Sequence, residues 1–307
     1  MAGGYGRQAR DIAAAVLGRD PGPLAAADSD SHHVYVGPDV AVKVIDAARH
    51  SRLDREIALA PFLPAGLTAL LLASGLWQSG TPEVRYACYA RVRGTAPGMG
   101  LPDTDAGTAR LLAEQAVQRL GALHGWLPVG HAEQTLREPP DDGGFVGRAG
   151  LLAGIDNLAA LDRGGLVPAR LLSGLTAIAE RAPLRAPQTT VPVHADCHWG
   201  NWLAWDRSVT ALLDFEWARF GEPADDWFFL IRFSGPHRET VLGVIADATG
   251  ASQETLRAEC EVREASYLVS DIRIGLERPG TPSPTTADRL RALGELIVGR
   301  SWWHHAG

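Results

Sequence analysis

Strand-like and helix-like hydrophobic patterns occupy different parts of this chain, and that separation constrains its fold more than any other feature. In the segment 33–45, apolar and polar residues alternate on either side of Gly37-Pro38-Asp39, which is the pattern of a β-hairpin. Up to about residue 93, strand-like stretches also cover 67–73 and 84–92, and helix-like stretches cover 7–17 and 49–63. We therefore expect a small sheet with few helices in this part.

Helical periodicity dominates after residue 94. A Gly- and Pro-rich linker leads to a strongly periodic stretch at 105–124, and further helical patterns continue to a last helix after a Pro/Thr/Ser loop at 278–286. The exception is the segment 191–214, where short apolar runs are interrupted by His, Asp, Gly and Asn. Strands gathered in one region and helices in another are typical of the α+β class.

Composition argues against several kinds of partner and location. The formal net charge of −7 argues against nucleic acid and against anionic membranes, because both select clustered Lys and Arg. Residues 1–10 lack the apolar stretch of a signal peptide, and the longest apolar run, 63–77, is interrupted and too short to span a bilayer. Cys88, Cys197 and Cys260 form neither a disulfide framework nor a metal-binding pair. We expect a cytoplasmic protein with reduced thiols, while its oligomeric state stays open.

Lysine occurs once in the chain, at Lys43, and the other basic residues are Arg. Arginine supplies a guanidinium wherever a general surface charge suffices, so a retained ammonium group suggests a site that needs a compact charge. Chance retention of one lysine is the alternative.

The interrupted segment contains the residues that chemistry requires. Asp196 and Asn201 are five residues apart, and Asp214 follows within Leu213-Asp214-Phe215-Glu216. Phosphoryl transfer needs a carboxylate that orients the attacking hydroxyl and oxygen ligands that hold Mg²⁺ against the phosphates. We assign Asp196 as the catalytic residue and Asn201 and Asp214 as metal ligands. Glu216 is either a second carboxylate beside the metal or a surface residue.

Zinc binding is the competing interpretation of the same segment, because His194, Cys197 and His198 are plausible zinc ligands. Three ligands within five residues, with no second Cys/His pair elsewhere, would make a strained site. The phosphoryl-transfer interpretation also explains Asn201 and Asp214, so we favour it.

The segment 193–201 resembles the catalytic loop of the aminoglycoside phosphotransferase family, which includes choline-kinase-like and other antibiotic kinases. Five of the six fixed positions in the family pattern His-Gly-Asp-x-His-x-Gly-Asn agree, at His194, Asp196, His198, Gly200 and Asn201. Further along, 221–226 resembles the family's Gly-Asp-Pro-x-x-Asp segment, and 119–124 resembles a helix end that ordinarily reads Leu-His. Ala195 replaces the usual Gly, Trp199 stands where Pro is common, and no GxGxxG occurs between residues 25 and 35, where Asp30-Ser31-His32-His33 stands instead.

The resemblance implies a protein-kinase-like, two-lobed fold. A small antiparallel-sheet lobe would cover 1–93 and bind nucleotide, a mainly helical lobe would cover 94–307, and the hinge would lie at about 90–94. The resemblance also implies that Lys43 pairs with Glu56 around the nucleotide phosphates and that the backbone of Ala90 and Val92 meets the nucleobase.

Three further residues receive roles near the catalytic loop. His198 either approaches phosphate or only braces the turn. We expect His194 to be structural, with its ring bonded to the backbone. Asp226 is expected to satisfy free N–H groups in the first turn of the helix that starts at Pro223.

The expected function is transfer of the γ-phosphoryl group of ATP or GTP, with Mg²⁺, to a hydroxyl of an antibiotic, as in a resistance kinase. A housekeeping kinase for choline, homoserine or a sugar is the first alternative. A catalytically dead kinase fold used for binding is the second, although such a protein usually lacks the base, a metal ligand or the lysine, and all are present here.

The acceptor is expected to be less cationic than kanamycin, for instance a nucleoside or peptide antibiotic. A polycation requires surplus carboxylates around its cleft, whereas from residue 251 onward acidic residues and arginines nearly match in number. We assign Trp199, Trp302 and Trp303 to acceptor binding, because flat rings suit stacking on a planar or sugar-bearing ligand. For Trp302 and Trp303, docking of the last helix is the alternative.

Overall fold

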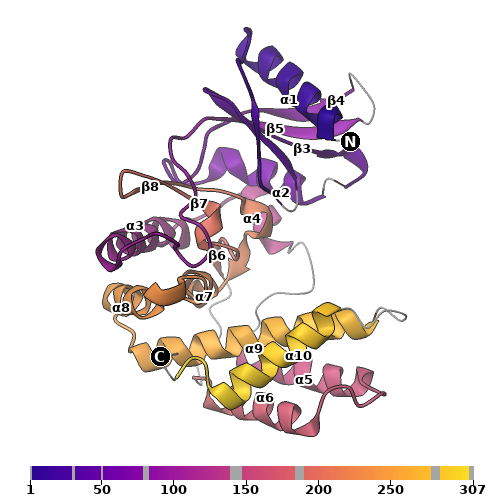
Figure 1. Ribbon diagram of the computed structural model, residues 1–307, viewed down its shortest axis with the longest axis vertical. Helices are drawn as coiled ribbons and strands as arrows, with labels where there is room; N and C mark the ends of the chain where they lie inside the picture. The colour runs from indigo at the N-terminus through magenta and orange to yellow at the C-terminus, as the bar shows by residue number, and fades with distance from the viewer. Residues whose placement is uncertain are drawn as a thin grey trace.

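The computed structural model describes residues 2–29, 32–49, 51–78, 83–138, 147–183, 190–277 and 284–303. Within them, one sheet is formed by strands in the order β1-β2-β3-β5-β4, and every neighbouring pair is antiparallel. The strands are β1 (Ala25–Ala27), β2 (His33–Val36), β3 (Val40–Asp46), β4 (Leu71–Trp77) and β5 (Val84–Ala90). Two helices accompany this sheet, α1 (Ala2–Leu17) and α2 (Ser51–Leu59) (Figure 1).

The two faces of the sheet pack against different helices, because side chains alternate along each strand. On β3, Val40, Val42 and Val44 are fully buried in a core that they share with Ile12 of α1. The alternation places Lys43 on the opposite face, where α2 packs through the fully buried Leu53. The strand that anchors one hydrophobic core thereby aims its ammonium group toward the helix on the other side.

Helices make up most of the remaining chain. They are α3 (Ala106–His124), α4 (His131–Arg137), α5 (Arg148–Leu161), α6 (Ala169–Arg181), α7 (Pro223–Arg232), α8 (Arg238–Thr249), α9 (Gln253–Glu277) and α10 (Pro284–Gly299). Short strands interrupt them: β6 (Val191–Val193) pairs with β9 (Arg219–Gly221), and β7 (Trp202–Trp205) pairs with β8 (Ser208–Leu212). In Figure 1 these strands lie between the sheet with α1 at one end and the group α5, α6, α9 and α10 at the other.

A glycine fixes the chain where it leaves the sheet. Gly94 has φ +133°, and a Cβ atom there would lie 2.7 Å from the carbonyl oxygen of Ala204 on β7. The next residue, Thr95, forms a bridge with Ala204 in both directions, with N–O distances of 3.0 and 2.9 Å. Only glycine allows the two backbones to approach this closely without strain, so the connection from β5 is held against the β7–β8 hairpin.

The predicted α+β class, with a small antiparallel sheet and a helical region, is confirmed. The hairpin expected at 33–45 and the helix expected at 105–124 are present as β2–β3 and α3. The strand expected at 67–73 begins later, at Leu71, because the chain first turns, with the Leu67 N–H donating to Pro64 O at 3.1 Å. The limits 1–93 and 94–307 stay a prediction, and most of the expected loop at 278–286 lies outside the described residues. None of the helices in the described part of the chain has both the length and the apolar character needed to cross a bilayer.

Candidate active site

Lys43 joins residues from three separate parts of the chain. Its Nζ lies 2.7 Å from Oε2 of Glu56 on α2 and 3.1 Å from Oδ1 of Asp214, which is 171 positions further along the chain. Burial disfavours the charge on Lys43, yet Asp214 and Glu56 outweigh it and raise its pKa. Burial opposes the ionisation of Asp214 as well, but Lys43 lowers the pKa of that carboxyl to about 2. Lys43 and Asp214 are therefore both charged near neutral pH, whereas burial raises the pKa of the Glu56 carboxyl.

The loop between β6 and β7 carries Asp196 and Asn201, which are hydrogen-bonded to each other. Asn201 donates from Nδ2 to the backbone oxygen of Asp196 at 2.8 Å and to its carboxylate Oδ2 at 3.2 Å. The Leu213 N–H donates to Asn201 O at 2.8 Å, which ties the loop to the residue before Asp214. Burial, with Asp214 nearby, raises the pKa of Asp196 to about 8. A carboxylate with this high proton affinity can accept a proton from a hydroxyl group.

Asp226 holds this loop through hydrogen bonds to its backbone. Its Oδ1 accepts the Ala195 N–H at 2.7 Å, and its Oδ2 accepts the His194 N–H at 3.1 Å and contacts His124 Nε2 at 2.8 Å. Burial opposes ionisation, but His124 and the backbone N–H groups lower the pKa of Asp226. Asp226 has a structural role, as expected, but the prediction that it satisfies N–H groups in the first turn of α7 is wrong. Asp225 supplies the capping interaction of α7, and Asp226 is turned toward the loop.

His194 is enclosed by backbone groups, as expected. Its Nδ1 accepts the Asp196 N–H at 3.2 Å, and its Nε2 lies 2.8 Å from Leu213 O, which suits a neutral ring that donates from Nε2. Burial lowers the pKa of His194. The zinc alternative loses support, because both nitrogens of His194 are engaged and Cys197 Sγ donates to Asp226 O.

His198 braces the turn and also faces Asp196. Its Nδ1 accepts the Gly200 N–H at 3.1 Å, and its Nε2 lies 3.7 Å from Asp196 Oδ1. The first contact agrees with the bracing alternative. A contact of His198 with phosphate stays a prediction.

The surroundings of Asp214 suit a bound cation. Asp214 itself has φ +70°, a conformation that costs energy for a residue other than glycine. Glu216 is 3% exposed, which excludes the surface alternative, and its Oε2 receives no hydrogen bond from the described residues. Burial, with Asp214 nearby, raises the pKa of Glu216 to about 7. Buried oxygen ligands in excess of nearby positive charge fit Mg²⁺, and Asn201 can add its amide oxygen because its amide nitrogen is turned to Asp196.

The residues expected to form the hinge lie at the end of β5 and directly after it. The Ala90 N–H donates to Leu70 O at 2.8 Å, so a nucleobase contact at Ala90 would have to use its carbonyl oxygen. The next N–H, of Arg91, donates to Asp39 O at 2.7 Å. Val92 is partly buried beside the α2 face of the sheet. The proposed nucleobase contacts of Ala90 and Val92 stay predictions.

Two of the three tryptophans assigned to the acceptor are core residues, and that assignment is wrong. Trp199 is fully buried and donates from Nε1 to Ser234 Oγ at 2.8 Å. Trp302 is fully buried, donates from Nε1 to Glu264 at 2.6 Å and has Arg238 over its ring. Each indole both fills apolar space and satisfies its N–H, so neither ring is available to stack on a ligand. Trp303 is partly buried against the same core, and its assignment stays a prediction.

Sequence reasoning missed two side chains that position α2. Tyr89 directly precedes the expected hinge at 90–94, and its hydroxyl donates to Glu56 Oε1 at 2.7 Å from the buried face of β5. Arg55, next to Glu56, is 8% exposed and donates from Nε to Ala218 O at 2.8 Å. The alternation of β5 would have placed Tyr89 beside Lys43, because Ala87 is the Cα partner of Lys43 and Tyr89 faces the same side.

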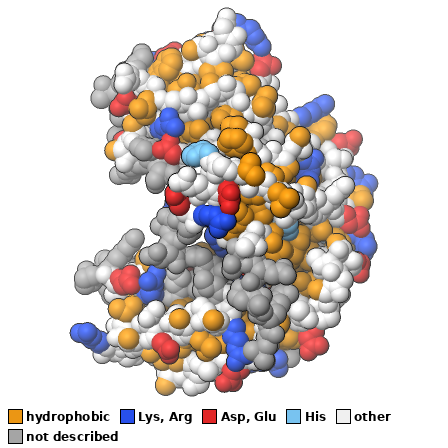
Figure 2. Space-filling view, turned by 180° about the vertical axis from the view of Figure 1, so that it is seen from behind, with side chains coloured by type: hydrophobic (Ala, Val, Ile, Leu, Met, Phe, Trp, Pro, Cys, Tyr) orange, Lys and Arg blue, Asp and Glu red, His pale blue; other side chains and the backbone are white. Residues whose placement is uncertain are grey.

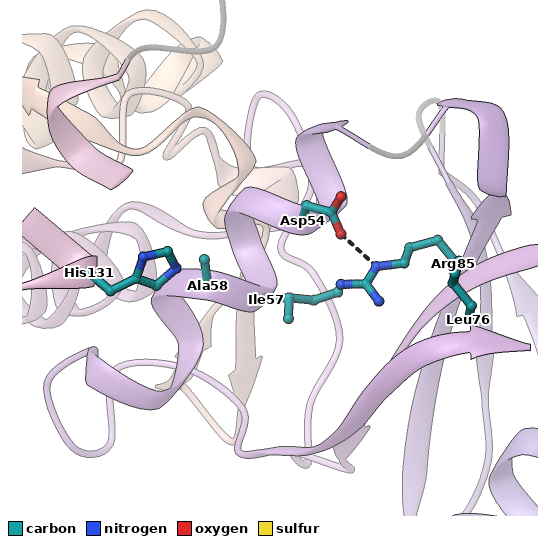
Figure 3. Close-up of a pocket in the computed structure, with 6 residues that line it drawn as sticks. All are labelled: Asp54, Ile57, Ala58, Leu76, Arg85 and His131. Atoms are coloured by element: carbon teal, nitrogen blue, oxygen red, sulfur yellow. Dashed lines mark hydrogen bonds and ion pairs between the residues drawn. The ribbon is translucent and has the colours of Figure 1, made fainter. Parts of the chain in front are cut away.

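A separate pocket of about 420 Å³ lies on the other side of α2. Figure 3 shows Asp54 and Ile57 of α2 on the side of Arg85 of β5, with Nε of Arg85 2.5 Å from Asp54, while Ala58 lies on the side of His131. None of the residues assigned to the site lines this pocket. It is therefore distinct from the cluster around Lys43.

Comparison with known proteins places this geometry in context. The model of the family described as "Phosphotransferase enzyme family" matches residues 24–261. A comparison with curated protein sequences gave no match.

Several solved structures share the fold at low sequence identity. One is the 2″-type aminoglycoside phosphotransferase APH(2″)-IIIa with GDP and kanamycin, at 15% identity and a TM-score of 0.70, with 94% of this chain and 98% of that chain covered. Another is a thermostable mutant of APH(4)-Ia with ADP and hygromycin B, at 15% identity, a TM-score of 0.62 and coverage of 95% and 98%. A macrolide 2′-phosphotransferase of type I matches at 19% identity, a TM-score of 0.59 and coverage of 92% and 94%.

Proposed function

The chain belongs to the phosphotransferase enzyme family and is a kinase with a hydroxyl acceptor, and we propose that it phosphorylates an antibiotic with ATP or GTP as donor. One observation carries this proposal. Lys43, Glu56 and Asp214 meet through hydrogen bonds of 2.7 and 3.1 Å, although they come from a strand, a helix and a distant loop. An ammonium held between two carboxylates beside a further pair, Asp196 and Asn201, is the arrangement that phosphoryl transfer requires.

In the proposed reaction, Asp196 orients the acceptor hydroxyl toward the γ-phosphorus and takes its proton as the new O–P bond forms. The bond between the γ-phosphorus and the bridging oxygen breaks, and the nucleoside diphosphate leaves. Lys43 binds phosphate oxygens, and Glu56 holds Lys43 in position. Asn201 and Asp214 would hold Mg²⁺, which neutralises charge on the phosphates when it is bound. No phosphoenzyme is expected.

The antibiotic class of the acceptor is proposed from proteins with this fold, two of which are complexes with kanamycin and hygromycin B and one of which is a macrolide 2′-phosphotransferase. The charge on α9 supports an acceptor less cationic than kanamycin. Five of its six acidic side chains are paired with arginines, in the pairs Glu259–Arg263, Glu261–Arg181, Glu264–Arg232, Asp271–Arg289 and Glu277–Arg273. A carboxylate that already holds a guanidinium attracts a cationic ligand weakly.

The surface supports the same acceptor class. Figure 2 shows the molecule hollowed between the part that contains the sheet and the part that contains α9 and α10. On this face, the acidic and basic side chains of the described residues are interspersed. Interspersed charges of both signs attract a ligand with several ammonium groups less than a surplus of carboxylates would.

A panel assay tests the proposed function. Nucleoside diphosphate release is measured with Mg²⁺ and ATP or GTP against aminoglycosides, macrolides, nucleoside and peptide antibiotics, choline, homoserine and sugars. We expect the highest kcat/KM for an antibiotic with few positive charges, and a raised inhibitory concentration of that antibiotic in a susceptible host. Asp196→Ala should abolish both effects.

The outcomes separate the alternatives. A much higher kcat/KM for a polyamino aminoglycoside would overturn the acceptor class and leave the antibiotic kinase in place. Turnover restricted to choline, homoserine or a sugar would establish the housekeeping alternative. Nucleotide binding without turnover of any acceptor in a wide panel would favour the binding protein.

A further inference from the structure

His32, Asp214 and Glu216 converge although they come from two distant segments. One ligand atom from each lies within 4.8 Å of the other two. His32 Nε2 and Glu216 Oε2 are 3.7 Å apart, which is too long for a hydrogen bond. Two donors bound to one ion at about 2.0–2.2 Å are separated by a distance of this order, roughly 3–4 Å. The spacing therefore suits a shared ion better than a direct bond.

These side chains are shielded from solvent. The side chains of His32 and Glu216 are 1% and 5% exposed. Glu216 Oε2 receives no hydrogen bond within the described part of the chain. Leaving a buried carboxylate oxygen without a donor is costly, so this oxygen is an independent sign that a positive group occupies the space beside it. Lys43 engages Oδ1 of Asp214 and leaves the second oxygen of that carboxylate for a ligand.

The donor set selects the kind of ion. Mg²⁺ takes oxygen ligands and keeps several waters, whereas an imidazole nitrogen beside carboxylates suits Zn²⁺ and neighbouring transition metals. We propose that His32, Asp214 and Glu216 form a transition-metal site that binds Zn²⁺ in the nucleotide-free protein. His32 lies between β1 and β2, and the other two ligands flank Phe215 after β8. The bound ion would link the β1–β2 connection to the segment that carries Asp214.

Inhibition by Zn²⁺ follows from the shared ligand. The two ions would compete, because Zn²⁺ held by His32 and the proposed Mg²⁺ with its nucleotide both need Asp214, whose Oδ1 is already engaged by Lys43. This consequence rests on the proposed function, whereas Zn²⁺ binding itself does not.

The test is calorimetric titration of the nucleotide-free protein with ZnCl₂ and, separately, with MgCl₂. We expect Zn²⁺ to bind about 100-fold more tightly than Mg²⁺. His32→Gln should weaken Zn²⁺ binding at least about tenfold and change Mg²⁺ binding less than about threefold, because removal of an imidazole affects the softer ion. His33→Gln is the matched control, since His33 is exposed on β2 and stacks on Tyr5 with ring centroids 4.2 Å apart. It should bind Zn²⁺ like the wild type.

Equal loss of Zn²⁺ affinity in both histidine variants, or no loss in His32→Gln, would overturn the site. His304 and His305 are present in every variant, so any ion that they hold cancels in the comparison. Circular dichroism establishes that the variants are folded, and Glu216→Gln gives a second variant with the same expected loss.

A spectroscopic measurement tests the same ligand independently of calorimetry. Pulsed electron paramagnetic resonance of the protein with Cu²⁺, which takes imidazole ligands, should show coupling to an imidazole nitrogen that His32→Gln loses and His33→Gln keeps, and an unchanged spectrum in His32→Gln would contradict the site. Zn²⁺ should also inhibit phosphoryl transfer in competition with Mg²⁺ and nucleotide. If no acceptor is phosphorylated at all, the proposed function fails while the titrations still decide the Zn²⁺ site.

Discussion

Two clusters of buried charge lie in this molecule, and they are constructed differently. At the first turn of α7, Arg263 of α9 donates to Asp225 at 2.7 Å and to Glu222 and Glu259 at 2.5 Å each, and Arg219 adds a second guanidinium at 3.2 Å from Asp225. At the candidate active site, Lys43 holds Glu56 and Asp214. Asp196 and Glu216 stand beside them with raised pKa values of about 8 and 7, mainly because of burial.

This difference indicates that the cluster around Arg263 stabilises the fold and that the cluster around Lys43 is suited to bind ligands. Around Arg263, guanidinium groups hold the carboxylates directly, so the cluster can join α7 to α9 without a ligand. Around Lys43, carboxylates exceed the positive charge that directly bonds them, and such an excess is tolerated where a cation or a reacting proton is to be bound. The following substitutions test this contrast, in order of decreasing expected effect.

Asp196→Asn should lower kcat by about 10²–10⁴-fold, because it removes the carboxylate that accepts the hydroxyl proton. Nucleotide affinity should stay similar, since the interaction arises in the transition state. Steady-state kinetics with the best acceptor and a nucleotide-binding titration measure the two quantities. Asp206→Asn, in the exposed turn between β7 and β8, is the control. Near-normal kcat in Asp196→Asn would show that another residue is the base.

Arg263→Met should lower the free energy of unfolding by about 3–5 kcal/mol, because it removes the guanidinium that holds three buried or partly buried carboxylates, of which Asp225 keeps its contact with Arg219. Chemical denaturation measures the change. Arg110→Met is a matched control at an exposed i,i+4 pair with Glu114, where the loss should stay below about 1 kcal/mol. Equal losses in the two variants would contradict the structural role of the buried cluster.

Lys43→Arg exchanges the ammonium of one cluster for the guanidinium that the other uses. A planar fork binds carboxylates well but cannot replace a compact charge between phosphate oxygens and Glu56. We expect the fold to remain stable while kcat/KM falls by roughly 100-fold, or about 2.7 kcal/mol. Denaturation and kinetics on the same preparation make the comparison. Retained activity would indicate that Lys43 has no specific contact with phosphate.

Tyr89→Phe removes the hydroxyl that donates to Glu56 Oε1 and leaves a buried carboxylate oxygen without that bond. The cost of about 1 kcal/mol should raise KM for nucleotide about five- to tenfold, because Glu56 then holds Lys43 less firmly. Tyr86→Phe, on the same strand but packed toward the α1 face, is the control. An unchanged KM with lower stability alone would mean that the Tyr89 hydroxyl only supports the fold.

Ala195→Gly should have the smallest effect. Ala195 has φ +63°, a conformation that disfavours Ala and not Gly. Relief of this strain should raise the free energy of unfolding by up to about 1 kcal/mol. Ala113→Gly, buried inside α3, should instead lower it by about 0.5–1 kcal/mol. Chemical denaturation of both variants decides, and a loss in Ala195→Gly would show that the loop gains nothing from glycine.

Much of the fold and part of the site could be predicted from local patterns. Alternation of apolar and polar residues indicated β2 and β3, and helical spacing indicated α3, because each pattern is set by neighbours in the sequence. The sole lysine and the loop from His194 to Asn201 pointed to the cluster that the structure brings together. The start of β4 was misplaced because a turn at Pro64 competes with strand formation.

The tryptophans and carboxylates show that local sequence patterns do not predict burial or the partner of a side chain. A Trp at a chain end or beside a catalytic loop has the same sequence signature whether it is exposed or buried, and burial placed Trp199 and Trp302 in the core. Asp225 and Asp226 are adjacent, yet one caps α7 and the other holds the loop that carries Asp196. Successive helix positions point about 100° apart, so the surrounding elements assign their roles.

The sequence by itself determined the chemical groups, their order and the periodicities that make strands and helices. Only the tertiary structure decided which charges meet, since Lys43 and Asp214 are 171 positions apart. It also decided that Glu216 is buried with an oxygen that no described donor satisfies, and that His32 faces it. The reason is physical: secondary structure follows from neighbours along the chain, whereas the energy of a buried charge depends on the groups that folding places around it.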